Sequence, residues 1–252
     1  MLSNIRIVLV RPRGSGNIGS IARAMKNMGA RDLAIVGKAR TRSFWARAMA
    51  VHGRDILGEA SCYNSLREAI ADCTLVVGTT CRAGLYRGHS QSPRDIAAEI
   101  AAAARTSKVA LIFGPEDHGL SNKDLEHCQL LITIPTDADY RSLNVAQATI
   151  ICLYEIFIAS SAPGNESTVE RASAEKIERL FDHMRKTLLK IGFLDSDNPE
   201  HMLLAFRRVL GRAGLEDKDV RIFTGLFRQI DWYTDQGWKV IQDKEKRGIK
   251  IR

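Results

Sequence analysis

The sequence lacks a C-x-x-C pair, although its 252 residues include five cysteines. Most of these cysteines lie in apolar runs, which is typical of reduced thiols in a protein core and not of a disulfide framework. His118, His127 and Cys128 are close in sequence, but their spacing is not that of metal ligands. We therefore expect neither a disulfide scaffold nor a zinc site.

Long apolar runs are also absent. The longest, residues 150–159, is interrupted by Glu155 and is too short to span a bilayer. The chain opens without a signal-peptide pattern, and it contains no internal repeat and no low-complexity tract. We expect a soluble, cytoplasmic protein that is long enough to bury a full hydrophobic core.

Acidic residues are scarce in the first 54 positions. Asp32 is the single acidic residue of this segment, which contains eleven Lys and Arg residues, whereas the whole chain has a net charge of +8. A basic segment of this kind can be no more than a solvated face. Its concentration nevertheless favours a partner rich in phosphate, such as a nucleic acid.

Short β-prone runs alternate with helix-like segments through the first 160 residues, and Gly or Pro residues punctuate them. The alternation predicts an α/β domain, with a mainly parallel sheet and helices on both faces. The expected strands are residues 5–10, 33–36, 75–79, 109–113 and 130–134, and the expected helices are residues 18–27, 44–51, 66–71, 92–105 and 143–159.

The pattern changes after residue 160. Residues 161–168 have the Ser, Pro and Gly content of a linker, and residues 169–238 show apolar positions at helical spacing in three segments. We predict a domain over 1–160, a linker over 161–168, a small all-helical domain over 169–238 and a charged tail over 239–252.

Gly14, Gly16 and Gly19 form a G-x-G-x-x-G pattern between a predicted strand and a predicted helix. This context suits a dinucleotide-binding loop, but the acidic residue expected after the second strand is missing. Lys38 and Arg40 could instead bind a 2′-phosphate, so an NADP-dependent reductase is one hypothesis. A tight strand-to-helix turn that merely needs glycine explains the pattern equally well.

Two polar loops follow apolar strands further along the chain, at residues 114–122 and 135–144. The carboxyl ends of parallel strands share one edge of a sheet, so both loops should border one ligand crevice. Glu116 lies in the first loop between two glycines, and Ser142 lies near the end of the second. Either residue could instead cap a helix: Glu116 the short helix after its loop, and Ser142 the apolar helix predicted over residues 143–159.

Three motifs carry a family resemblance. Asn17-x-Gly19-x-x-x-Arg23, Gly114-x-Glu116-x-x-Gly119-Leu120-Ser121 and Ile134-Pro135 with the later Ser142-Leu143-Asn144 occur in this order. Together they resemble the signatures of the SpoU-type (SPOUT-class) RNA ribose 2′-O-methyltransferases. An α/β part followed by a short helical domain looks most like the TrmJ-type tRNA methyltransferases, which modify cytidine or uridine at the first nucleotide of the anticodon loop.

The resemblance implies S-adenosylmethionine as methyl donor, tRNA as substrate, a trefoil knot near the end of the catalytic domain, and a homodimer. The apolar helix predicted over residues 143–159 would suit the dimer interface. A non-catalytic RNA-binding module on the same fold is a further hypothesis.

The resemblance also assigns roles to individual residues. Those implied in catalysis are Arg23, Asn17, Glu116, Ser142 and Asn144. Those implied in cofactor binding are Thr79, Thr80, Cys81, Gly114, Glu116, Gly119, Ile134, Ser142, Leu143 and Asn144. The arginines expected to contact RNA are Arg11, Arg13, Arg23, Arg82 and Arg87.

Overall fold

The computed structural model describes residues 2–81, 90–161, 171–237 and 239. The chain divides into two compact units, Met1–Glu175 and Lys176–Arg252. Most of the expected linker and nearly all of the expected tail lie outside the described residues. No helix in the described part of the chain is long and apolar enough to cross a membrane.

A six-stranded sheet with the order β3-β2-β1-β5-β4-β6 forms the centre of the first unit. Its strands are β1 (Ile5–Val10), β2 (Asp32–Val36), β3 (Ser61–Tyr63), β4 (Leu75–Thr79), β5 (Val109–Phe113) and β6 (Leu130–Ile132). All five strand pairs are parallel. Every strand therefore ends at the same edge of the sheet, where the polar loops follow.

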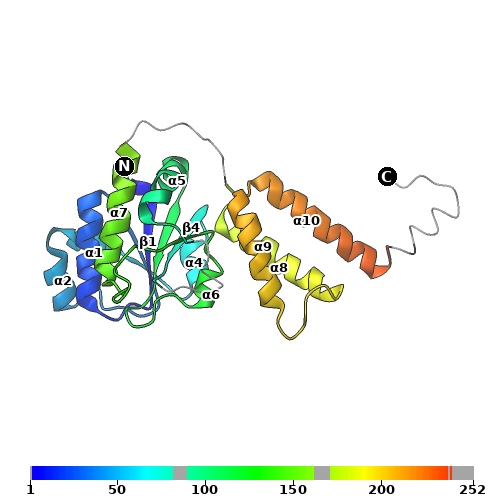
Figure 1. Cartoon of the computed structure of the whole chain (residues 1–252), viewed down its shortest axis with the longest axis horizontal. Coiled ribbons are helices and arrows are strands. Elements are labelled where there is room, and N and C mark those ends of the chain that lie inside the picture. The colour runs from blue at the N-terminus through cyan, green and yellow to red at the C-terminus, as the bar shows by residue number, and fades with distance from the viewer. Residues whose placement is uncertain (1, 82–89, 162–170, 238, 240–252) are drawn as a thin grey trace. The chain divides into compact units, whose positions relative to one another are not determined.

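Helices cover both faces of this sheet (Figure 1). One face packs against α1 (Ser15–Met28), α2 (Phe44–Ala50), α3 (Arg54–Glu59), α5 (Pro93–Thr106) and α7 (Val145–Ser161). The other packs against α4 (Leu66–Ile70), α6 (Asn122–Leu125) and the first residue of α8 (Ala174–Lys190). Five of the six β1 side chains are apolar and at most 1% exposed. Each stabilises the fold by roughly 1.5–3 kcal/mol.

The predicted architecture is confirmed, and the expected strands at residues 5–10, 75–79 and 109–113 match the observed ones. The pattern missed α3 and β3, because β3 is a three-residue edge strand with two exposed side chains and no apolar run. The expectation of core cysteines was wrong in part: Cys73 and Cys152 are buried, but Cys62 and Cys81 are exposed. Burial raises the pKa of both buried thiols to about 12.

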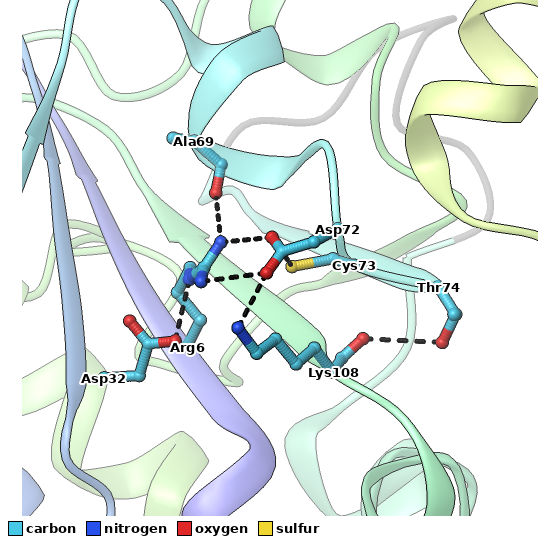
Figure 2. Close-up of polar contacts among 7 residues, drawn as sticks. All are labelled: Arg6, Asp32, Ala69, Asp72, Cys73, Thr74 and Lys108. Atoms are coloured by element: carbon cyan, nitrogen blue, oxygen red, sulfur yellow. Dashed lines mark hydrogen bonds and ion pairs between the residues drawn. The ribbon is translucent and has the colours of Figure 1, made fainter.

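An ionic cluster centred on Arg6 lies at the amino-terminal end of the sheet (Figure 2). The Arg6 side chain is only 7% exposed, and its Nε donates to Asp32 Oδ2 at 2.9 Å. Its two terminal nitrogens donate to the Asp72 carboxylate at 2.5 and 3.2 Å, and one also donates to the Ala69 carbonyl at 2.8 Å. Lys108 donates to Asp72 at 2.7 Å. The cluster therefore joins β1, β2, the α4–β4 turn and the residue before β5.

The second unit contains the rest of α8, then α9 (Pro199–Ala213) and α10 (Asp217–Trp232), followed by a π-helical turn at Tyr233–Gly237. The prediction of three helices is confirmed. Asp231 on α10 joins α10 to α8: it lies 2.9 Å from His183 Nε2 and accepts from the buried Thr187 hydroxyl at 3.0 Å. Arg207 on α9 donates twice to the buried Glu178, at 2.6 and 2.9 Å. These polar contacts fix how the three helices pack.

We expect Asp72→Asn to flatten the acid limb of the stability curve. Burial alone would raise the pKa of Asp72, but the hydrogen bonds from Lys108 and Arg6 outweigh it and hold the pKa below its usual value. The contribution of such a carboxylate is complete above its unfolded pKa of about 3.9, and it is lost as the pH falls through the folded pKa. Urea unfolding at several pH values from neutral down to about 3 measures this change. The exposed Asp139→Asn variant is the control, and equal pH dependence in both variants would contradict the assignment.

Candidate functional site

A cavity of about 300 Å³ opens at the carboxyl edge of the sheet. This volume is at the lower end for small-molecule sites. The loops after β4, β5 and β6 and the start of α7 line it, through Thr79, Thr80, Cys81, Phe113, Gly114, Pro115, Glu116, Asp117, His118, Gly119, Leu120, Ile132, Ile134, Arg141, Ser142, Leu143, Val145 and Ala148. The sheet edge predicted to hold the site is therefore the one that is hollowed.

Nine of the ten residues expected to bind a cofactor line this cavity, and the exception is Asn144. Asp117, His118 and Arg141 also line it, although sequence reasoning had not selected them. The apolar residues Phe113, Leu120, Ile132 and Val145 were missed as well, because an apolar side chain at a strand end looks the same whether it packs in the core or faces a ligand.

The Glu116 carboxylate holds two loops together. Its Oε1 accepts from the Gly14 amide and from Asn17 Nδ2, both at 2.9 Å, and its Oε2 accepts from the Arg13 amide at 2.9 Å. Burial alone would raise the pKa of Glu116, but these three donors outweigh it and lower the pKa, so the group is an ionised acceptor. Glu116 therefore fastens the β5–α6 loop to the β1–α1 loop.

Asn144 extends this connection to a third segment. Its Nδ2 donates to Asn17 Oδ1 at 2.9 Å, and its Oδ1 accepts from the backbone amides of Ala146 and Gln147 at 2.9 and 3.4 Å. Asn144 is thus the residue that caps α7. The hypothesis that Ser142 caps a helix over residues 143–159 was wrong, because the helix begins at Val145. Ser142 faces the cavity instead.

The hypothesis that Glu116 caps the next helix was also wrong. Ser121 caps α6, and its hydroxyl and amide bond Asp124 in a capping box, with Oγ to Oδ2 at 2.6 Å. Glu116 does not cap α6, because it lies five residues before the cap residue Ser121. The capping hypothesis assumed partners close in sequence, whereas the residues that donate to Glu116 lie about a hundred positions away.

Gly114 is required by close packing. A Cβ at this position would lie 2.2 Å from the Gly119 carbonyl carbon and 2.3 Å from the Leu120 nitrogen. Gly119 itself has a φ of +65°, in the left-handed region that favours glycine. The two glycines let the 114–120 loop fold back on itself and present its backbone to the cavity.

The glycines of the β1–α1 loop serve internal packing. The Gly14 amide donates to the Glu116 carboxylate, so this amide is already paired within the protein. A Cβ on Gly19 would lie 2.2 Å from the Ala46 carbonyl oxygen of α2. Gly14 and Gly19 are thereby explained without a dinucleotide, and the reductase hypothesis has no support.

The predicted RNA-binding arginines are placed differently from one another. Arg11 pairs with the nearly buried Asp124 at 2.7 Å, and Arg13 pairs with Asp117 at 2.7 Å. Arg23 is exposed on α1 and is not among the residues that line the cavity. Arg82 and Arg87 lie outside the described residues. Two of these cations are therefore partly neutralised by neighbouring carboxylates.

The model of the SpoU rRNA methylase family matches residues 4–154, more than half of the sequence. The chain belongs to the SpoU methylase family. A second model, of the C-terminal domain of the tRNA methyltransferase TrmJ, matches residues 175–244. The resemblance deduced from three short motifs is thereby confirmed, and it extends to the helical unit.

The chain is similar to known methyltransferases over most of its length. A tRNA (cytidine/uridine-2′-O-)-methyltransferase TrmJ from Sodalis glossinidius is 37% identical over 236 residues, which is 92% of each chain. The crystal structure of TrmJ from Z. mobilis has a TM-score of 0.75 and 28% identity, over 90% of this chain and 98% of that one. An AdoMet-bound rRNA methyltransferase from Sinorhizobium meliloti has a TM-score of 0.50 and 25% identity, over 62% and 56%.

Replacing Glu116 with Gln should loosen the loops around the cavity. The amide offers one acceptor oxygen where the carboxylate offers two, so at least one of the three donors loses its partner. We expect a loss of roughly 1 kcal/mol of unfolding free energy and faster hydrogen exchange at the Arg13 or the Gly14 amide, whichever loses its acceptor. Urea unfolding and amide exchange measure the two effects. The exposed Glu59→Gln variant is the control, and unchanged exchange at both the Arg13 and the Gly14 amide would contradict the role of Glu116.

Proposed function

We propose that this chain transfers a methyl group from S-adenosylmethionine to the ribose 2′-hydroxyl of cytidine or uridine in tRNA, at the first nucleotide of the anticodon loop. The observation that carries the proposal is that both parts of the chain match. The SpoU family model covers the first unit, the TrmJ C-terminal model covers the second, and the Sodalis relative spans 92% of the chain.

The cavity suits the proposed cofactor. An apolar slot lined by Ile132, Ile134 and Leu143 can accept a flat base, and the 114–120 loop offers close backbone approach through Gly114. When bound, S-adenosylmethionine supplies an electrophilic methyl group. The residues of the chain then have to orient the ribose hydroxyl and stabilise the charge that develops on it.

The roles of the predicted catalytic residues follow from their contacts. Asn17 is hydrogen-bonded to both Glu116 and Asn144, and we assign these three residues to holding the loops in place. The Ser142 hydroxyl lines the cavity and is free of such a contact among the hydrogen bonds of the described residues, so we assign it to the ribose. A guanidinium offers hydrogen-bond donors and no acceptor, so Arg23 would act as a positive charge and not as a general base.

For Arg23 to take part in methyl transfer, a second copy of the chain is required. It lies on the exposed side of α1, which packs beside α7 (Figure 1). Because α7 exposes about half of the Tyr154 and Ile158 side chains, 49% and 51%, we infer a homodimer formed through this helix. Such a dimer would place Arg23 close to the second copy, where it could serve that copy's site or the RNA bound there. The trefoil knot implied by the family resemblance likewise stays a prediction.

The function is tested by methyl transfer from tritiated S-adenosylmethionine into tRNA. We expect transfer by the native chain, and nucleoside mass spectrometry should find the methyl group on the ribose of cytidine or uridine. Arg23→Ala should lower turnover by about 100-fold or more, while calorimetry with S-adenosylhomocysteine shows unchanged affinity. Arg31→Ala, another exposed arginine of the basic segment, is the matched control. Full turnover by Arg23→Ala would remove Arg23 from the mechanism, and a native chain without transfer would refute the function.

The proposed dimer is tested by Ile158→Glu. The side chain is half exposed in a single chain, so the substitution should preserve the fold, but a buried charge at an interface would favour the monomer. Light scattering after size exclusion measures the mass, and circular dichroism checks the fold. Ile222→Glu, on an isoleucine of α10 that is 68% exposed, is the control. A dimeric Ile158→Glu variant would show that α7 is not the interface.

A further inference from the structure

Helix α2 presents large apolar side chains to solvent. Phe44, Trp45 and Met49 are 75%, 64% and 45% exposed, whereas Ala46 and Ala50 on the opposite side are fully buried. The Phe44 and Trp45 rings meet edge to face with centroids 5.5 Å apart. Two aromatic rings and a methionine on one short helix are far more exposed apolar surface than packing of the first unit requires.

This helix is held against α1 at unusually short range. The Ala46 carbonyl oxygen of α2 lies 2.2 Å from the position that a Cβ on Gly19 would take. Just after α2, a Cβ on Gly53 would lie 2.7 Å from the Ala22 carbonyl oxygen of α1. Val51, which ends α2, has a φ of +50°, a strained value for a β-branched residue. Strain of this kind persists where the surrounding structure holds a functional surface in place. The exposed rings therefore lie on a helix that is held rigidly against α1.

Positive charge surrounds the rings. Lys38, Arg40, Arg42, Arg47 and Arg54 are all exposed, and the sequence has no acidic residue between Asp32 and Asp55. A second copy of this face would set like charges against one another, and the buried centres of protein interfaces are poor in charge. Single-stranded RNA complements this surface, because its bases stack on aromatic rings while its phosphates attract arginine.

The surface borders the catalytic region. The Met49 side chain lies 3.8 Å from the position that a Cβ on Gly16 would take, and Gly16 immediately precedes Asn17. Asn17 is bonded to Glu116, which lines the cavity. Figure 1 shows α2 beside α1 on the same layer of the first unit. RNA on α2 would therefore lie next to the first turn of α1, within reach of the site.

We propose that Phe44, Trp45 and Met49 form a platform on which an unpaired nucleotide of the substrate RNA stacks, with Arg42 and Arg47 on its phosphates. The platform binds a loop nucleotide near the one that is methylated. This inference rests on the proposed function in one respect only, namely that the RNA bound is the substrate tRNA.

The test uses Trp45 as its own reporter. The sequence has three tryptophans, so a Trp232→Phe, Trp238→Phe variant leaves only Trp45. We expect a single-stranded oligoribonucleotide to quench its fluorescence, and an RNA duplex of the same length to leave it nearly unchanged. No quenching by single-stranded RNA would overturn the proposal.

Kinetics of the full-length chain provide the second measurement. Trp45→Ala should raise KM for tRNA about tenfold, with kcat and the affinity for S-adenosylhomocysteine unchanged, and Trp45→Phe should restore most of the loss. Trp232→Ala, at a tryptophan that is 44% exposed on α10, is the matched control. An unchanged KM in Trp45→Ala would overturn the proposal. So would a fall in molecular mass, which would show that the face binds a second copy.

Failure of the platform is distinguishable from failure of the proposed function. A native chain that transfers no methyl group to tRNA refutes the function, yet quenching of Trp45 by single-stranded RNA still supports the platform. A native chain that methylates tRNA, with a Trp45→Ala variant that behaves identically, refutes only the platform.

Discussion

The Glu116 carboxylate is the contact on which the site depends. It accepts two hydrogen bonds from the loop between β1 and α1 and a third from Asn17 in the first turn of α1, and Asn17 is in turn hydrogen-bonded to Asn144, the cap of α7. The β1–α1 segment is thereby held to two segments that lie about a hundred residues or more further along the chain. Because the acceptor is charged and its donors are largely backbone amides, the connection is strong and leaves little freedom of orientation. A cavity built from loops needs such a fixed point if its backbone groups are to bind a ligand precisely enough for chemistry.

The two ends of the sheet have different tasks. At the amino end, Arg6 gathers Asp32, Asp72 and the Ala69 carbonyl, and the charges there are satisfied within the protein. At the carboxyl end, the loops after β4, β5 and β6 turn backbone groups and a few polar side chains toward an open cavity. The ionic cluster at the amino end therefore includes none of the groups that line the cavity. This separation lets the loops carry glycines and exposed polar residues that a core could not accept.

Helix α1 connects the site with the surfaces around it. Its first turn supplies Asn17, one side packs on α2 at glycine contacts, and another side packs on α7. The exposed rings of α2 and the exposed apolar positions of α7 are thus both attached to the helix that enters the site. A partner bound to either surface would contact a support that is continuous with the Glu116 connection. This is the physical basis on which RNA binding and dimer formation could both complete the site.

Sequence alone determined the layered α/β fold, the three helices of the second unit and half of the cavity lining. Strand runs such as Val109–Phe113 and loop glycines such as Gly114 are local signals that act through backbone preference and burial. Only the tertiary structure showed which groups the polar loop residues contact. Glu116 was open to a capping role and Ser142 to another until the folded chain showed that Ser121 and Asn144 are the caps. The α2 surface was not foreseen, since an exposed Trp45 and a buried one look alike in sequence. Which residue caps a helix and which side chain is exposed depend on contacts between segments that are distant in sequence, and local residue spacing does not encode those contacts.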